Sequence, residues 1–208
     1  MRVVGVTKGF GPDAVRAALD AGLRDLGENY AAELVAKTGA EAGGDGGGGG
    51  GGGEAGARRA VWHFLGAIQR NKVADLAPVV GVWQSVAREV EGARIARFAP
   101  GATVMVQVDV TGRAGRNGCP PDGVGDLVGR LLALDLDVVG LMTVAAPGRA
   151  AAETAFGEVA RLADDLGLKE RSMGMSDDLE PAVAAGSTMV RIGRALFGER
   201  PAAGSAAR

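Results

Sequence analysis

The sequence predicts a single α/β domain folded as a (β/α)8 barrel, and three features of its 208 residues support this prediction. Short runs of β-branched and other aliphatic residues alternate with segments long enough to form helices. Most of these runs are continuously apolar, which is typical of parallel strands buried on both faces. Eight such units fit a small barrel. An open, doubly wound sheet is the alternative fold, because a single sequence does not fix the number of strands.

The eight predicted strands are short, as expected for a barrel. They cover residues 2–6, 24–27, 61–65, 79–83, 103–109, 136–142, 170–173 and 187–191.

Proline, glycine and capping residues mark the helices between these strands. Pro12 opens the first helix and Gly22 closes it. Ser85 is a preferred N-cap residue, and we expect it to start a helix that runs to about Phe98. The stretch 120–122, Pro-Pro-Asp, opens a further helix.

The helix after the seventh strand is expected to start nearer Asp178 than Ser176, because Pro181 follows and fits only the first helical turn. Acidic residues at this start also suit the positive end of the helix dipole.

One segment does not fit the strand–helix alternation. Ten of the eleven residues 43–53 are glycine, and only Asp45 interrupts them. Such a segment buries no apolar area, so it predicts a flexible Gly-rich loop inserted at the surface. A P-loop is excluded, because the run lacks the Gly-Lys-Ser/Thr ending that binds phosphate.

Composition excludes several classes of function. The net charge is −2 and no Lys/Arg run exceeds two residues, which argues against a nucleic-acid or polybasic membrane site. No stretch approaches the ~20 apolar residues of a membrane span, and the N-terminus lacks a signal-peptide pattern. We therefore expect a cytoplasmic protein. The single cysteine, Cys119, lies in a predicted loop without a basic cluster beside it and is not expected to be reactive.

Polar residues gather where three predicted strands end. Lys8 follows the first strand, and the run 172–178, Ser-Met-Gly-Met-Ser-Asp-Asp, follows the seventh. The segment 186–193 carries the eighth strand and ends in Gly193. Glycine and serine at such turns leave backbone N–H groups free to bind phosphate. A lysine beside a phosphate site suggests pyridoxal 5'-phosphate (PLP) held as a Schiff base.

These motifs occur in the order found in a known family. They are Val6-Thr7-Lys8, 25–30 (Asp-Leu-Gly-Glu-Asn-Tyr), 62–66 (Trp-His-Phe-Leu-Gly), 69–72 (Gln-Arg-Asn-Lys), 140–143 (Gly-Leu-Met-Thr), 172–178, 186–193 and 195–198 (Ala-Leu-Phe-Gly). With them the chain resembles the pyridoxal-phosphate homeostasis proteins, which are single-domain relatives of the alanine racemase barrel (fold type III). The resemblance covers nearly all of 1–208, which we take as one PLP-binding domain.

The resemblance implies a cofactor site and no catalytic or metal-binding residue. It places the PLP aldehyde on Lys8 and Asn29 within reach of the ring. Ser176 and the backbone at Gly193 and Arg194 would hold the phosphate. In the related racemase barrel the position of Arg191 faces the pyridine nitrogen, and an arginine there keeps that nitrogen unprotonated.

The chain departs from the family pattern in two places besides the glycine run. The family usually has about one helix before the first strand, whereas this chain begins almost at that strand, as expected of a shortened or mis-started reading frame. In the loop 111–118, arginine stands where relatives commonly have lysine, which preserves the charge.

The resemblance implies a monomeric carrier that buffers PLP and releases it to apo-enzymes, without a dedicated catalytic turnover. Related two-domain racemases use a tyrosine from a second domain as the other base, and Tyr30 is the only tyrosine here. A low-activity PLP-dependent racemase is the alternative, and a phosphate-sugar enzyme without a Schiff base is a third. His63, the only histidine, is expected to be a hydrogen-bonded core residue rather than a metal ligand.

Overall fold

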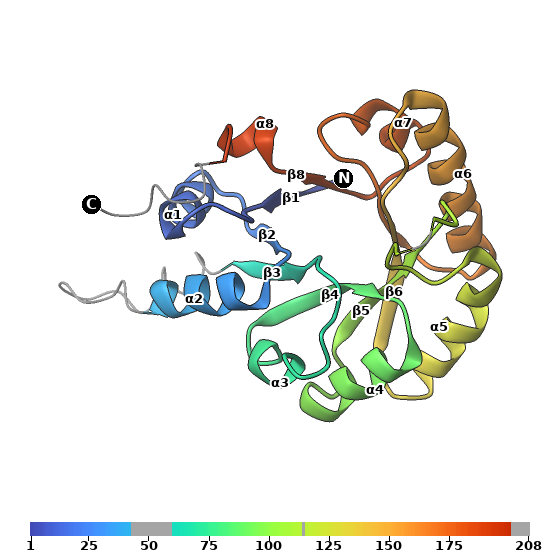
Figure 1. The fold of residues 1–208 in the computed structure, drawn as a ribbon, viewed down its shortest axis with the longest axis horizontal. Coiled ribbons are helices and arrows are strands. Elements are labelled where there is room, and N and C mark those ends of the chain that lie inside the picture. The colour runs from blue at the N-terminus through green and yellow to red at the C-terminus, as the bar shows by residue number, and fades with distance from the viewer. Residues whose placement is uncertain (43–59, 114, 201–208) are drawn as a thin grey trace.

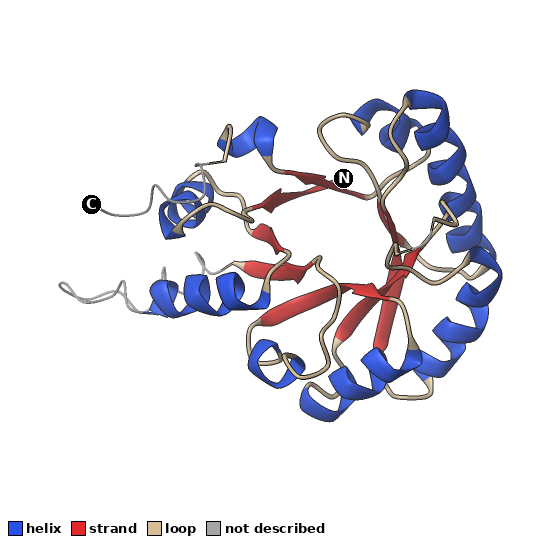
Figure 2. Cartoon of the chain, viewed as in Figure 1, coloured by secondary structure: helices blue, strands red, loops and turns tan. Residues whose placement is uncertain are grey.

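The computed structural model describes residues 1–42, 60–113 and 115–200. The predicted Gly-rich loop at 43–53 lies outside these residues. The described chain forms a closed barrel of parallel strands in sequence order, and its helices surround the strands (Figures 1 and 2). This confirms the barrel and rules out the open, doubly wound alternative.

Every predicted strand is present, with ends that move by up to three residues. The strands are β1 (Arg2–Val6), β2 (Asp25–Glu28), β3 (Val61–Phe64), β4 (Val80–Val86), β5 (Thr103–Val108), β6 (Asp137–Thr143), β7 (Glu170–Ser172) and β8 (Met189–Ile192). The helices are α1 (Pro12–Asp20), α2 (Ala31–Ala42), α3 (Val73–Leu76), α4 (Glu89–Phe98), α5 (Val124–Leu132), α6 (Arg149–Asp165), α7 (Leu179–Ala184) and α8 (Arg194–Phe197).

The helices pack on the barrel through apolar stripes. In α5, buried Val124, Leu127, Val128 and Leu131 recur at the spacing of one helix face, so this face covers the strands and the opposite face meets solvent. A short 3₁₀ turn, Pro121–Gly123, precedes α5 and accounts for the predicted helix start at 120–122.

The predicted cap at Ser85 is wrong. Ser85 is buried in β4, and its hydroxyl donates a hydrogen bond of 2.5 Å to the carbonyl of Gly66. Helix α4 begins later, at Glu89, where the carboxylate of Glu91 accepts from the backbone N–H groups of Ala87 and Arg88. The helix ends at Phe98 as expected, and α7 starts after Asp178 as expected.

The barrel closes where its last strand meets its first. Arg191 of β8 pairs with Val4 of β1, and Val6 of β1 pairs with Gly27 of β2. The loops after β8, β1 and β2 are therefore neighbours at the carboxyl end of the barrel. This is the end at which barrels of this kind carry their functional sites.

Candidate functional site

Three of the predicted site residues follow the neighbouring strands β8, β1 and β2. Lys8 lies in the turn after β1, Asn29 directly follows β2, and Gly193 directly follows β8. A β-carbon at Gly193 would lie 3.3 Å from the carbonyl oxygen of Val6, a tight contact at the seam between β8 and β1. The topology thus brings the lysine and the glycine turn together.

Lys8 has the electrostatic environment of a nucleophilic amine. The side chain is half-buried, and the hydrogen bonds and ion pairs of the described residues do not involve its amine. Desolvation lowers the pKa of Lys8, and the charges of Arg200 and Arg191 lower it further, while Glu28 opposes them. A lower pKa raises the fraction of neutral amine near pH 7, which is the form that attacks a carbonyl.

A buried ion pair behind Lys8 fixes its backbone. Lys37 of α2 is paired with Glu28, and both side chains are buried. The Lys37 amine also donates a hydrogen bond of 2.8 Å to the carbonyl of Thr7, and Glu33 accepts one of 2.8 Å from the N–H of Gly9. The residues on both sides of Lys8 are therefore held by α2.

Sequence analysis missed this cluster, although it leaves a signal. Glu33 and Lys37 are four residues apart on a helix, and Glu28 ends an apolar strand where a charge needs a partner. Their spacing predicts an ion pair, but only the fold shows that Lys37 reaches back to the turn of Lys8.

Asn29 is held by the same buried glutamate. Glu28 Oε1 accepts from the Asn29 N–H at 2.7 Å. The Asn29 carbonyl lies against Gly66, where a β-carbon would overlap its oxygen. Asn29 is half-buried and directly follows β2, at the carboxyl end of the barrel.

The loops after β7 and β8 meet at an ion pair. Arg194 Nη2 lies 2.9 Å from Asp177 Oδ2, next to exposed Ser176. Asp178 closes the β7 loop by accepting from the Met175 N–H at 2.5 Å. The structure therefore brings Ser176 and Arg194 to one edge of the barrel mouth.

Arg191 is buried inside the barrel and donates hydrogen bonds to three acceptors. Its guanidinium donates to the carbonyl and hydroxyl of Ser172 at 2.6 and 2.8 Å, and to the carbonyl of Thr143 at 2.7 Å. Desolvation lowers its pKa to about 10, opposed by the charge of Asp178. Arg191 therefore stays cationic near pH 7, and because it is buried it does not take part in a surface ion pair.

From Arg191 a row of polar side chains crosses the barrel. Ser172 Oγ lies 2.6 Å from Gln84 Oε1, and Gln84 Nε2 lies 2.6 Å from His63 Nδ1. His63 Nε2 lies 2.9 Å from Asp25 Oδ1, at the start of β2. His63 is fully buried, which confirms it as a hydrogen-bonded core residue.

Sequence analysis gave no role to Gln84 or to Ser172, although Ser172 begins the run 172–178. Both are polar side chains that are fully buried, in β4 and at the end of β7, but their pairing depends on barrel closure.

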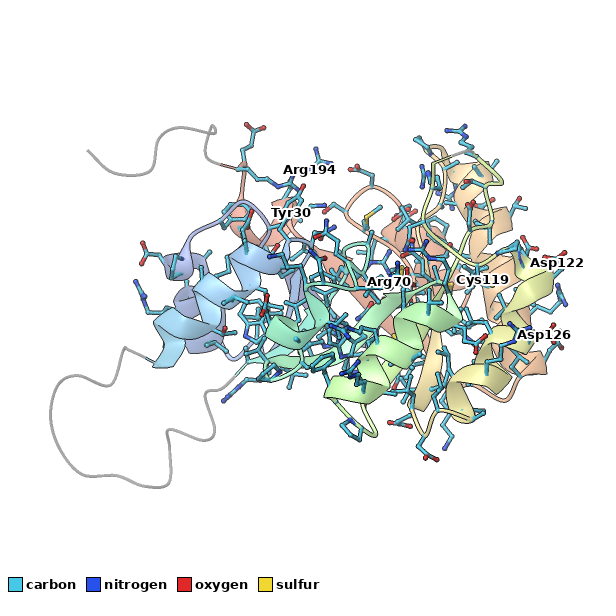
Figure 3. All side chains as sticks on the ribbon, turned by 60° about the horizontal axis from the view of Figure 1, so that its bottom comes forward. Tyr30, Arg70, Cys119, Asp122, Asp126 and Arg194 are labelled. Carbon is cyan, nitrogen blue, oxygen red and sulfur yellow. The ribbon has the colours of Figure 1, made fainter. Side chains whose placement is uncertain are left out.

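The cysteine that the sequence predicts to be unreactive is Cys119. Cys119 lies well away from Arg194 and Tyr30 (Figure 3), and burial raises the pKa of its thiol, in agreement with an unreactive cysteine. Within residues 1–42, 60–113 and 115–200, no group of three His, Cys, Asp or Glu side chains is placed to hold a metal ion. In the same ranges no helix combines the length and apolarity needed to cross a bilayer.

The donors at the barrel mouth fit a phosphorylated aldehyde. The backbone N–H groups of Arg194 and Ala195 start α8 and have no acceptor within the helix, so they can bind an anion. Lys8 adds an amine beside the β8–β1 seam that has no hydrogen-bond or ion-pair partner among the described residues, and β8 carries the buried cation of Arg191. Phosphate donors and an amine of this kind would suit the phosphate and the aldehyde of PLP.

Known proteins are similar to this chain in sequence and in fold. The family described as "alanine racemase, N-terminal domain" matches residues 1–201. The pyridoxal phosphate homeostasis protein of Pseudomonas aeruginosa is 39% identical over 90% of this chain and 79% of its own. That of Deinococcus radiodurans is 38% identical over 95% and 88%.

A solved structure extends the comparison. PipY of Synechococcus elongatus, solved without PLP, superposes with a TM-score of 0.83 at 28% identity, over 95% of this chain and 93% of its own. The same protein has been solved with PLP bound, with a TM-score of 0.79. The chain therefore belongs to the alanine racemase N-terminal domain family, among the pyridoxal phosphate homeostasis proteins.

Proposed function

We propose that this protein binds PLP through Lys8 and acts in PLP homeostasis, as a carrier without a dedicated catalytic turnover. The half-buried amine of Lys8 at the β8–β1 seam, which takes part in no hydrogen bond or ion pair of the part of the chain that the structure describes, carries the proposal. Support comes from PipY, which binds PLP and has the same fold, and from the names of the curated relatives.

When bound, PLP supplies an aldehyde that condenses reversibly with a lysine amine. Lys8 is the residue proposed to bind it, because its lowered pKa makes neutral amine available. The backbone that follows β8 at Gly193 and Arg194, with the free N–H groups of Arg194 and Ala195 at the start of α8, would bind the phosphate together with the hydroxyl of Ser176, and Asn29 would orient the ring.

Arg191 is proposed to face the ring nitrogen. A cation at that place donates hydrogen bonds and disfavours a proton on the nitrogen, which weakens the ring as an electron sink. Because the resemblance gives the racemase barrel the same position beside the ring nitrogen, Arg191 by itself does not distinguish a carrier from a racemase.

Racemisation needs a second base besides the lysine, so the presence of such a base distinguishes a racemase from a carrier. Tyr30 is the only tyrosine of the sequence, it is 59% exposed, and the side-chain hydrogen bonds found among the described residues do not involve its hydroxyl. As a carrier, the protein would work in the cytoplasm as a monomer and pass PLP to apo-enzymes.

The deciding experiment is the visible spectrum of the purified protein with PLP, before and after borohydride. We expect a band that reduction converts to a covalent adduct, and mass spectrometry should locate it on Lys8. Lys8→Ala should lose it, whereas Lys169→Ala, which changes an exposed lysine before β7 at the other end of the barrel, should keep it. A Lys8→Ala variant that still forms the adduct would refute the assignment.

A racemase assay on the same samples separates the two functions. The carrier proposal predicts no turnover of alanine or serine enantiomers above the rate of free PLP. Turnover that disappears in Lys8→Ala would establish the enzyme instead.

A further inference from the structure

In the row of polar side chains that runs from Arg191 to Asp25, every hydrogen bond donates in the same direction along the row. Arg191 can only donate, so Ser172 Oγ accepts from it at 2.8 Å and must direct its own hydrogen elsewhere. The acceptor within reach is Gln84 Oε1, at 2.6 Å. The Ser172 hydroxyl therefore links the orientation of the Arg191 guanidinium to the orientation of the Gln84 amide.

The orientation of the Gln84 amide follows from this contact. With its oxygen facing Ser172, its nitrogen faces Met189 Sδ at 2.9 Å and His63 Nδ1 at 2.6 Å. An amide nitrogen donates and does not accept, so His63 Nδ1 must accept and carries no proton. The ring proton then lies on Nε2 and points to Asp25 Oδ1 at 2.9 Å.

Every hydrogen bond thus runs the same way, from a buried cation to a carboxylate at the other end of the barrel. The side chains of Ser172, Gln84 and His63 are fully buried, and that of Asp25 is 22% exposed. A ring proton on Nδ1 would face the amide N–H group and oblige Gln84 to turn over. Ser172 would then lose the acceptor of its hydrogen.

We propose that Ser172, Gln84 and His63 are positioning residues for Arg191, and that their hydrogen bonds hold His63 as the neutral Nε2–H tautomer. Together they fix the direction of the guanidinium beneath the barrel mouth. That the guanidinium faces a cofactor ring rests on the proposed function, whereas the chain of hydrogen bonds does not.

The first test needs no cofactor. His63 is the only histidine, so ¹⁵N-histidine labelling gives one pair of ring-nitrogen resonances. We expect an unprotonated Nδ1 and a protonated Nε2 at neutral pH. An Nδ1–H tautomer, or a doubly protonated ring, would overturn the proposal.

The second test asks whether the chain transmits a change. Ser172→Ala should shift the His63 Nδ1 resonance, although the hydrogen bonds of Ser172 reach His63 only through Gln84. It should also speed proton exchange and rotation at the Arg191 guanidinium. The control is Ser187→Ala, which removes another buried hydroxyl, bonded to the Met173 carbonyl, and should change neither.

If Ser172 only fills space in the core, Ser172→Ala and Ser187→Ala should have the same effect on the His63 resonance and on the Arg191 guanidinium. That result would also refute the proposal that Ser172 positions Arg191. With PLP added, Ser172→Ala should shift the cofactor absorbance relative to wild type and Ser187→Ala. If the wild-type protein binds no PLP, the proposed function is refuted, whereas the resonance measurements still test the hydrogen bonds from Arg191 to Asp25.

Discussion

Lys37 donates a hydrogen bond of 2.8 Å to the carbonyl of Thr7, so a buried cation from α2 holds the residue that precedes Lys8. The same amine neutralises Glu28, whose other oxygen binds the N–H of Asn29. The turn of Lys8 and the turn of Asn29 therefore share one buried ion pair.

Removing one member of this pair should be costly. Lys37→Met leaves Glu28 buried and unpaired, which is expected to lower the free energy of unfolding by about 3–5 kcal/mol. Denaturant unfolding measures this loss. Adding Glu28→Gln should recover much of it, and Arg161→Ala, in an exposed pair with Asp165, should cost under about 1 kcal/mol. Equal losses for the two single variants would contradict the account.

Gly66 supports Asn29 by having no side chain. A β-carbon there would overlap the Asn29 carbonyl, so Gly66→Ala should shift the β2 loop and cost about 1–3 kcal/mol of stability. It should also weaken PLP binding, measured by absorbance titration. Gly157→Ala, in an open position of α6, should instead stabilise the protein by up to about 1 kcal/mol.

Asp25 should make stability depend on pH in the acid range. The hydrogen bond from His63 lowers the pKa of Asp25, so its stabilisation is complete above the ordinary value of about 3.9 and is lost as the pH falls through the lowered pKa. Asp25→Asn should therefore be less stable than wild type at pH 7, by about 1 kcal/mol, with the difference shrinking toward pH 2. Urea unfolding across pH tests this, with exposed Asp20→Asn as the control. A constant difference would exclude Asp25 as its source.

Arg194 should matter for binding and little for stability. Its ion pair with Asp177 is exposed on both sides, so Arg194→Ala should change stability by less than about 1 kcal/mol. Loss of a cation beside the phosphate donors should weaken PLP binding several-fold, most clearly at low salt. Arg161→Ala provides the matched exposed arginine, and equal affinities would remove the Arg194 side chain from the site.

The strand–helix order was predictable because buried parallel strands leave continuous apolar runs. Ser85 shows where this local view fails. A serine before a helix is a good cap, but β4 runs on to Val86 and uses the hydroxyl against Gly66 instead. Strand ends depend on neighbouring strands, so they are not encoded locally.

The site could be predicted only as far as loop positions allow. Lys8 and Gly193 were predicted because each follows a strand, whereas Asn29 was implied by the family resemblance. Gln84 and Ser172 received no role, because 88 positions in the sequence separate them and only barrel closure makes them partners.

The seam between β1 and β8 has a consequence for biosynthesis. Of the described strands β1 is made first, and it completes its pairing only with β8, which is made last of them, since Val4 pairs with Arg191. Until then the nascent chain exposes one edge of β1, which is a site for mispairing and for chaperone capture. Because Gly193 and α8 follow β8, the proposed PLP site is complete only once β8 has been synthesised.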